Sequence, residues 1–438
     1  MSKLAINGGQ KVVSLPVPMW PQVGEEEIQA VLDALKKSST DMSYLTSLLG
    51  GEALSTFEEG FAEFIGTKYA LATNGCGTAL HTALAACGVE AGDEVIVSPY
   101  SYGQSVACVL QQNAIPIFAD INPDTYTLDP KFVEERITPS TKAIVIVHIF
   151  GHPADMDPIM EIAREHGLKV IEDCAQSTGA IYKGKKTGAF GDVSCFSLGN
   201  GKPLIGGEGG ALLTDDQDIF ERAVLMTQGF ERQEALIQSE ELKKRIDNLI
   251  YTYRIHPLAA VIASVQLKHI DQWNQERRQN AAFLSDGLKD VPGIKSPVVA
   301  EGCEHVWYIY SPTFVAEEIE GISRKRYAEA LEAEGVDIDL GYAKKPIHLR
   351  LPFQERQYFQ GRGLPWSGTF VHRKVEYKAG DCPVAEDRCQ NKDLKIGILS
   401  SRWRGDQSPL LRQYLDAFHK VAENLDGLRN VTSRSFPK

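Results

Sequence analysis

Basic residues are fewer than acidic ones in this sequence, and this imbalance limits the kinds of molecule that the protein is expected to bind. The 438 residues include 46 Lys and Arg against 58 Asp and Glu, a formal net charge of -12. Nucleic acids and anionic membrane surfaces select proteins that present a basic face. We therefore expect no nucleic acid and no membrane among the partners, and we favour a small-molecule substrate.

Long apolar runs are also missing. A membrane-spanning helix needs about 20 mostly apolar residues, and no such run occurs. Residues 1–9 lack the apolar centre of a signal peptide. These absences predict a cytoplasmic chain.

Paired cysteines and metal-binding motifs are the third absence. The 8 cysteines form no Cys-x-x-Cys pair, and the 10 histidines include no His-Glu-x-x-His and no zinc-type spacing. We expect reduced thiols, no disulfide framework and no catalytic metal.

What the sequence does contain is typical of a soluble globular protein, with 43% hydrophobic and 24% charged residues. Short apolar runs alternate with helical patterns, which predicts an α/β fold with a mostly parallel central sheet flanked by helices. Ligands bind such sheets at the carboxyl ends of the strands. Strands are expected at residues 69–73, 94–98, 115–119, 143–147, 169–172, 192–196, 211–214 and 307–314, and helices at residues 79–87, 104–112, 131–136 and 159–166.

Composition divides the chain into three parts. Residues 1–21 predict an N-terminal arm, and residues 22–257 a large ligand-binding domain. Residues 258–438 predict a bridging helix, to about residue 288, and a smaller C-terminal α+β domain. The loop at residues 342–381 is rich in Gly and Pro, and so long a loop in a compact domain is functional or covers a site.

Lys202 lies in a stretch of small and uncharged residues between glycines. The stretch is not a P-loop, because Phe196 replaces the first glycine and Pro203 the hydroxyl residue. It is not a Gly-x-Gly-x-x-Gly fingerprint either, because Leu204 replaces the last glycine. A poorly solvated lysine is a possible nucleophile toward a carbonyl. A glycine-rich hairpin with a solvated lysine is the alternative.

Other polar residues follow the predicted strands. Residues 73–80 end a strand and begin a helix, whose free N–H groups could bind a phosphate through Gly75, Cys76, Gly77 and Thr78. A simple turn with Thr78 as N-cap is the alternative.

Two further strand ends carry candidate ligand contacts. Asp173 follows the strand at residues 169–172, with Gln176 close behind. A buried carboxylate needs a cationic partner, so Asp173 either caps the next segment or holds a protonated ligand nitrogen. Tyr102 follows the strand at residues 94–98, where its ring either covers a planar ligand or packs in the core.

Together these groups meet the requirements of pyridoxal 5'-phosphate. A lysine forms the imine, a carboxylate keeps the pyridine nitrogen protonated, and backbone donors bind the phosphate. The same lysine can then move a proton between substrate and cofactor.

Five motifs carry a resemblance over nearly the whole chain: residues 91–97 (AGDEVIV), 121–130 (INPDTYTLDP), 151–157 (GHPADMD), 172–176 (EDCAQ) and 196–210 (FSLGNGKPLIGGEGG). They resemble the DegT/DnrJ/StrS family of sugar and cyclitol aminotransferases, which are pyridoxal-phosphate-dependent enzymes of fold type I. The resemblance implies that Lys202 bonds to the cofactor, Asp173 contacts the pyridine nitrogen and Gln176 the ring hydroxyl. It further implies that Ser197 binds the phosphate and that Tyr102 stacks on the ring.

The resemblance also implies a reaction. An amino group would pass from glutamate or glutamine, through pyridoxamine phosphate, to a ketone on a sugar or cyclitol, in a homodimer with shared active sites. The N-terminal sequence LAINGG and Trp20, with Asn-Gly before Lys202, resemble the branch that acts on cyclitol ketones and 3-amino-5-hydroxybenzoate precursors.

Two positions depart from the family pattern. Cys76 and Gly77 stand where the phosphate loop usually has Gly-Thr, and Thr252 stands where the neighbouring subunit usually supplies an asparagine. Substrate contacts are expected from Tyr342 and His348 in the long C-terminal loop.

Three alternatives were weighed on the same residues. A dehydratase of this family typically has histidine at the lysine position, and a non-catalytic regulator should have lost Lys202 or Asp173, yet both are present. A pyridoxal-phosphate-dependent elimination, dehydration or cyclisation remains open.

Overall fold

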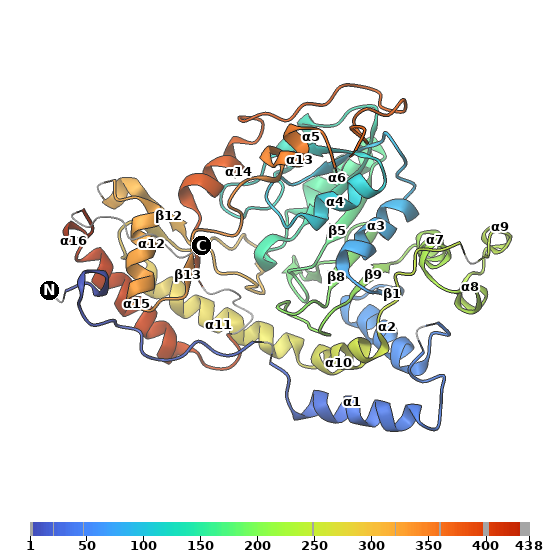
Figure 1. Cartoon of the computed structure of the whole chain (residues 1–438), viewed down its shortest axis with the longest axis horizontal. Coiled ribbons are helices and arrows are strands. Elements are labelled where there is room, and N and C mark those ends of the chain that lie inside the picture. Colours follow the sequence, from blue (N-terminus) through green and yellow to red (C-terminus); the bar gives the residue numbers. More distant parts are fainter. Residues whose placement is uncertain are drawn as a thin grey trace.

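A seven-stranded sheet forms the centre of the computed structural model, which describes residues 3–20, 22–46, 48–247, 249–319, 321–358, 361–396 and 403–429 (Figure 1). Strands β8, β5, β4, β2 and β3 run parallel, and β9 is antiparallel to both of its neighbours, β8 and β1. The predicted mostly parallel sheet is confirmed. In spatial order the strands are β1 (Tyr69–Thr73), β9 (Gly210–Thr214), β8 (Val193–Ser197), β5 (Lys169–Asp173), β4 (Thr141–Val147), β2 (Glu94–Val97) and β3 (Ile115–Phe118).

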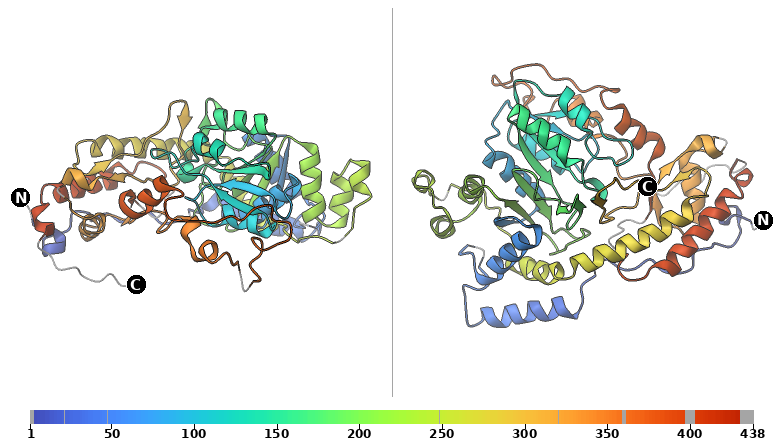
Figure 2. Two further views of the ribbon diagram at one scale, coloured as in Figure 1. Left: turned by 90° about the horizontal axis from the view of Figure 1, so that it is seen from above. Right: turned by 180° about the vertical axis from the view of Figure 1, so that it is seen from behind.

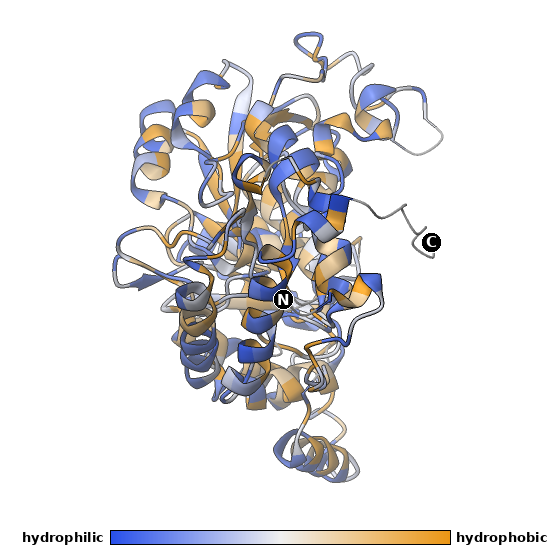
Figure 3. Ribbon diagram, turned by 90° about the vertical axis from the view of Figure 1, so that its left-hand side faces the viewer, coloured by the Kyte–Doolittle hydropathy of each residue, from blue (hydrophilic) through white to orange (hydrophobic). Residues whose placement is uncertain are grey.

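Helices cover both faces of this sheet. Strand β4 shows why: Val145 packs in one core with helices α3 (Cys76–Ala86) and α4 (Gln104–Gln111), whereas Ile144 packs in another with α5 (Pro130–Glu135) and α6 (Met156–His166). Successive side chains of a strand point to opposite faces, so a continuous apolar run requires cover on both sides. Figure 3 shows this apolar character in the central strands and mixed character in the outer helices.

The long helix expected at residues 258–288 is two helices, α10 (Pro257–Leu267) and α11 (Ile270–Leu288). They are separated at Lys268 and His269, whose N–H groups bond to Val265 and Gln266, three residues back in the chain. Helix α10 contacts α2 (Glu52–Ile65) beside the central sheet, and α11 extends to α15 (Ser408–Ala422) (Figures 1 and 2).

The N-terminal arm packs into a further core, separate from the two that flank the sheet. Leu4 and Val13 are buried among residues of α11, α12 (Arg324–Ala333) and α15 (Ser408–Ala422). The N–H of Ala5 donates to Glu334 Oε1 at 2.8 Å. Of the predicted arm, residues 1, 2 and 21 lie outside the described residues.

The segment at residues 342–381 packs on the large domain, although the sequence assigned it to the C-terminal one. Phe353 and Tyr377 join the core around Phe118, and Tyr377 Oη donates to Pro116 O at 2.9 Å. Arg373 pairs with the carboxylate of Glu94. The segment thereby covers the β2–β3 edge of the sheet, near α4 and α5 in Figure 1.

No helix among the described residues is both long and apolar enough to cross a membrane. The remaining elements are the other helices and several short strands. They are α1 (Glu25–Ser38), α2 (Glu52–Ile65), α7 (Gln217–Thr227), α8 (Phe230–Leu236), α9 (Glu240–Lys243), α13 (Leu351–Gln354), α14 (Pro383–Asp387), α16 (Asp426–Arg429), β6 (Ile181–Tyr182), β7 (Lys185–Lys186), β10 (Ile294–Lys295), β11 (Cys303–Glu304), β12 (Thr313–Phe314), β13 (Ile338–Asp339) and β14 (Lys395–Ile396), with 3-10 turns at Ala5–Asn7, Ile149–Gly151, Ala316–Ile319 and Ile347–Leu349 and a π-helical turn at Arg388–Lys392.

Candidate active site

At the amino end of α3, no side chain caps the first backbone N–H groups. Its N-cap is Gly75, which has no side chain to occupy the first-turn N–H groups. Thr78 is therefore not the N-cap, and its hydroxyl instead lies 2.7 Å from both Asn74 Oδ1 and Gly75 O. A Cβ on Gly210 would lie 2.6 Å from the nitrogen of Cys76, so only glycine lets β9 approach this turn. Free N–H groups at a helix start favour an anion.

Asp173 ends β5 close to this turn, with its side chain buried. Ser105 Oγ donates to Asp173 Oδ2 at 2.6 Å, and the N–H of Ala175 donates to Oδ1 at 3.1 Å. The Cys76 thiol lies 3.9 Å from the same Oδ1. Sequence reasoning missed Ser105, because only the packing of α4 against β5 brings the hydroxyl to the carboxylate.

A second buried carboxylate holds the end of β5 in place. Glu172 accepts hydrogen bonds from the N–H groups of Gly188, Phe190 and Gly191 at 2.7 to 2.8 Å. The Nε2 atom of His148 lies 3.0 Å from Glu172 Oε2. Burial opposes the charge of this carboxylate, but His148 and the backbone donors outweigh it, so the pKa of Glu172 lies below its ordinary value.

Lys202 lies in the loop between β8 and β9, and its N–H donates to Gly199 O at 3.0 Å. Its side chain is partly buried, and Nζ lies 4.7 Å from the centre of the Tyr308 ring. Among the described residues no carboxylate forms an ion pair with it. The loop folds back through a bond from the N–H of Leu198 to Gly209 O, so it is the predicted hairpin, but its lysine points to a ring.

The Cys76 thiol connects the lysine and the carboxylate. Burial raises the pKa of Cys76 well above its ordinary value, Asp173 raises it further, and Lys202 partly offsets both. The thiol therefore stays neutral between a cation and an anion. This arrangement confirms that the loop after β1, the end of β5 and the loop after β8 meet at the carboxyl edge of the sheet.

Ser197 and Gln176 are two further residues that the sequence predicts to contact the cofactor. Ser197, at the end of β8, accepts a hydrogen bond from the N–H of Gly199 at 3.3 Å. Gln176 Oε1 accepts from the N–H of Phe150 at 2.7 Å, and Nε2 donates to Tyr342 Oη at 3.2 Å. Gln176 thus ties the β4 loop to Tyr342, one of the two substrate contacts expected in the C-terminal loop.

Three predicted residues lie farther out. Tyr102 is 63% exposed, so it does not pack in the core. Thr252 is exposed, while the neighbouring Tyr253 O accepts from the N–H of Asn74 at 2.8 Å. His348 is fully buried, 3.0 Å from Glu386 Oε1, and lines a small cavity next to Phe118 that does not include Tyr342. The substrate contact expected from His348 stays a prediction, although its ring is buried and lines a different cavity from the one beside Tyr342.

Comparison with known proteins shows which family the chain belongs to. Residues 21–379 match the DegT/DnrJ/EryC1/StrS aminotransferase family. The chain belongs to this family. It is 36% identical over 81% of its length to the dTDP-3-amino-3,4,6-trideoxy-alpha-D-glucose transaminase of Streptomyces venezuelae, covering 88% of that protein. It is 32% identical over 98% of its length to the L-glutamine:2-deoxy-scyllo-inosose aminotransferase of Micromonospora echinospora, covering all of it. The structure of S. venezuelae DesV in complex with a ketimine intermediate is similar with a TM-score of 0.74 and 30% identity, over 93% of this chain and 99% of that one.

As a member of the DegT/DnrJ/EryC1/StrS family, the chain is a pyridoxal-phosphate-dependent aminotransferase of fold type I. The residues present fit the cofactor. The uncapped start of α3 offers N–H groups for a phosphate, and the partly exposed amine of Lys202 is not held in an ion pair with any described carboxylate. The carboxylate of Asp173 lies 3.9 Å from the Cys76 thiol, whose pKa both Asp173 and Lys202 influence.

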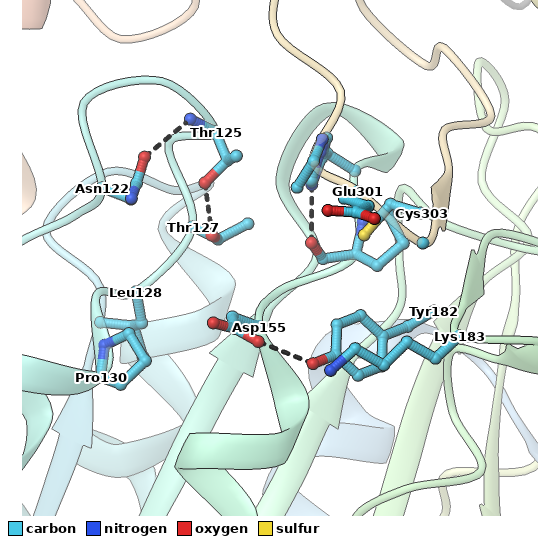
Figure 4. Close-up of a pocket in the computed structure, with 14 residues that line it drawn as sticks. Asn122, Thr125, Thr127, Leu128, Pro130, Asp155, Tyr182, Lys183, Glu301 and Cys303 are labelled. Atoms are coloured by element: carbon cyan, nitrogen blue, oxygen red, sulfur yellow. Dashed lines mark hydrogen bonds between the residues drawn. The ribbon is translucent and has the colours of Figure 1, made fainter.

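A second cavity in this family member, of about 510 Å³, lies apart from these groups (Figure 4). Its lining includes Asp155, Tyr182, Glu301 and Cys303 but none of the predicted cofactor contacts. The cavity of Figure 4 is therefore separate from the residues expected to bind the cofactor.

His152 beside that cavity predicts acid sensitivity. The N–H of Ala300 donates to Nε2 at 3.0 Å, so the ring is neutral. Burial lowers the pKa of His152 from 6.5 to about 4. The unfolded chain therefore binds a proton first as the pH falls, and stability present above pH 6.5 is lost down to about pH 4.

A variant isolates this effect. In His152→Asn the amide can replace the Nδ1–H that donates to Pro153 O, without a group that titrates. Between pH 6.5 and about pH 4, the free energy of unfolding of the wild type should fall by up to about 3 kcal/mol more than that of the variant, at about 1.4 kcal/mol per pKa unit. Urea denaturation at several pH values measures this, and parallel curves would contradict it.

Proposed function

We propose that this chain transfers an amino group from glutamine or glutamate to the ketone of a cyclitol or a sugar, with a cyclitol ketone as the first candidate. The observation that carries the proposal is that the Lys202 amine and the Asp173 carboxylate both act on Cys76, the first residue of the uncapped helix α3. The alignment to the inosose aminotransferase, which spans 98% of this chain, supports the cyclitol.

Each residue has a task that its position supports. Bound pyridoxal phosphate supplies an electron-accepting ring that carries the amino group between donor and ketone. Asp173 would hold negative charge toward the ring nitrogen, and Ser105 orients that carboxylate. Ser197 and the first N–H groups of α3 would bind the phosphate, and Gln176 would contact the ring hydroxyl. The amine of Lys202 would hold the cofactor and move a proton at the substrate carbon.

We also propose a homodimer with shared active sites. Leu249 and Tyr251 are 91% and 56% exposed, and the Tyr251 ring lies 5.5 Å from that of His81 in α3, so apolar surface is open to a partner here. In a dimer this segment, with Thr252, would lie at the neighbouring subunit's phosphate site. Sedimentation at the mass of a single chain would contradict this arrangement.

A substrate screen tests the activity. Purified enzyme with glutamine is expected to convert an inosose to its amino product, followed by mass spectrometry, and to act less on nucleotide-linked keto-sugars. Glutamate and alanine serve as comparison donors. Loss of water or ring closure without nitrogen gain would instead support the elimination or cyclisation alternative.

A further inference from the structure

A cavity of about 650 Å³ lies beside Tyr102, between α4 and the segment at residues 342–381. It adjoins Gln176, because Tyr342 lines the cavity and also accepts the hydrogen bond from Gln176. Its polar lining consists chiefly of Tyr102, Gln104, Tyr342, Arg350, Tyr358 and Lys395.

This cavity is cationic in an acidic protein. Arg350 and Lys395 line it, and no Asp or Glu does so among the described residues, although the chain carries a formal net charge of -12. Lys395 is occupied by an ion pair with Asp339 at 2.8 Å. Arg350 makes one long hydrogen bond, from Nε to Lys345 O at 3.4 Å, and pairs with no described carboxylate.

The guanidinium of Arg350 stands next to a second source of positive potential. Its Nη1 lies 3.7 Å from the place a Cβ would take on Gly103, the N-cap of α4. A cation at the amino end of a helix is unfavourable unless an anion lies near both. The arrangement gains stability when an anionic oxygen enters the cavity.

We propose that Arg350 binds the carboxylate of the amino donor. The inference rests on the proposed function, in which a neutral cyclitol ketone meets an amino acid, so the donor carboxylate is the one obligatory substrate anion. A single available guanidinium matches a carboxylate, to which it can donate two parallel hydrogen bonds. Arg350 is therefore a specificity-determining residue for the donor.

Binding measurements on the holoenzyme test this without requiring turnover. The probe is glutaramate, which is glutamine without its amino group and cannot react. Calorimetric titration should show a Kd raised about 10- to 100-fold in Arg350→Gln, the range of a charge-assisted hydrogen bond. The Kd of Arg350→Lys should lie between those of the wild type and Arg350→Gln, because lysine keeps the charge and loses the paired donors.

The matched control is Arg362→Gln, which removes an exposed arginine from the same segment outside the cavity lining. It should bind glutaramate as the wild type does. Thymidine diphosphate provides the second arm, since it imitates the phosphate handle of a nucleotide-linked sugar.

The outcomes separate cleanly. Glutaramate binding that is absent in the wild type, or unchanged in Arg350→Gln, overturns the proposal. Weakened binding of thymidine diphosphate alone also overturns it, because Arg350 would then hold the acceptor. Arg350-dependent glutaramate binding in an enzyme that transfers no amino group would contradict the proposed function and leave this donor site supported.

Discussion

Replacement of Lys202 by alanine should lower the rate of amino transfer by at least about 10³-fold. The loss combines covalent attachment with proton movement, and a positioned acid or base alone contributes about 10²- to 10⁴-fold. Steady-state turnover with the best donor and ketone measures the rate. The absorbance of the bound cofactor should shift as well, because no other lysine lies in the loop between β8 and β9.

Two further variants make this result specific. Lys202→Arg keeps the positive charge over the Tyr308 ring but cannot form the imine, so it should be nearly as inactive as the alanine variant. Lys68→Ala removes an exposed lysine and should leave turnover unchanged. If Lys202→Ala retains both the absorbance band and turnover, Lys202 is not the cofactor lysine.

Replacement of Asp173 by asparagine should lower turnover by about 10²-fold or more while preserving the fold. The amide oxygen can still accept the hydrogen bond from Ser105, which is 2.6 Å long in the wild type. The negative charge that keeps the ring nitrogen protonated is lost, and a charge in a buried site acts far more strongly than one in water. Turnover and cofactor affinity are measured together.

The comparison variant for Asp173 is Asp155→Asn, at the cavity of Figure 4. It removes the same charge from a strand-end loop outside the site and should keep wild-type turnover. If the thermal unfolding midpoint of Asp173→Asn matches that of the wild type, the variant remains folded. Equal turnover of Asp173→Asn and wild type would exclude a role for this carboxylate in the chemistry.

Local sequence patterns predicted most of the sheet. The strands at residues 69–73, 115–119 and 143–147 were placed to within about two residues, because each is a buried apolar run that only a covered strand can accommodate. The strand expected at residues 307–314 was wrong for most of its length. Trp307 has a φ of 54°, which no strand allows, and only Thr313–Phe314 forms β12.

Spacing in the sequence also predicted the cofactor contacts but not the residues that pack against them. The positions of Lys202, Asp173 and Ser197 after strands imply one edge of the sheet, because parallel strands end together. Tyr308, more than 100 positions from Lys202, and Ser105, 68 from Asp173, have no local pattern that marks them. Their contacts depend on how the segments pack.

By itself, the sequence determined the fold class and the cofactor and singled out Lys202 as the proposed anchor, because apolar periodicity and glycine spacing act over short stretches of chain. Only the tertiary structure decided which side of the long C-terminal loop meets the site. It turned Tyr342 and Arg350 toward the cavity beside Tyr102 and buried His348 against Glu386. In a loop without periodicity, the direction of each side chain is set by distant packing partners, which the local sequence does not encode.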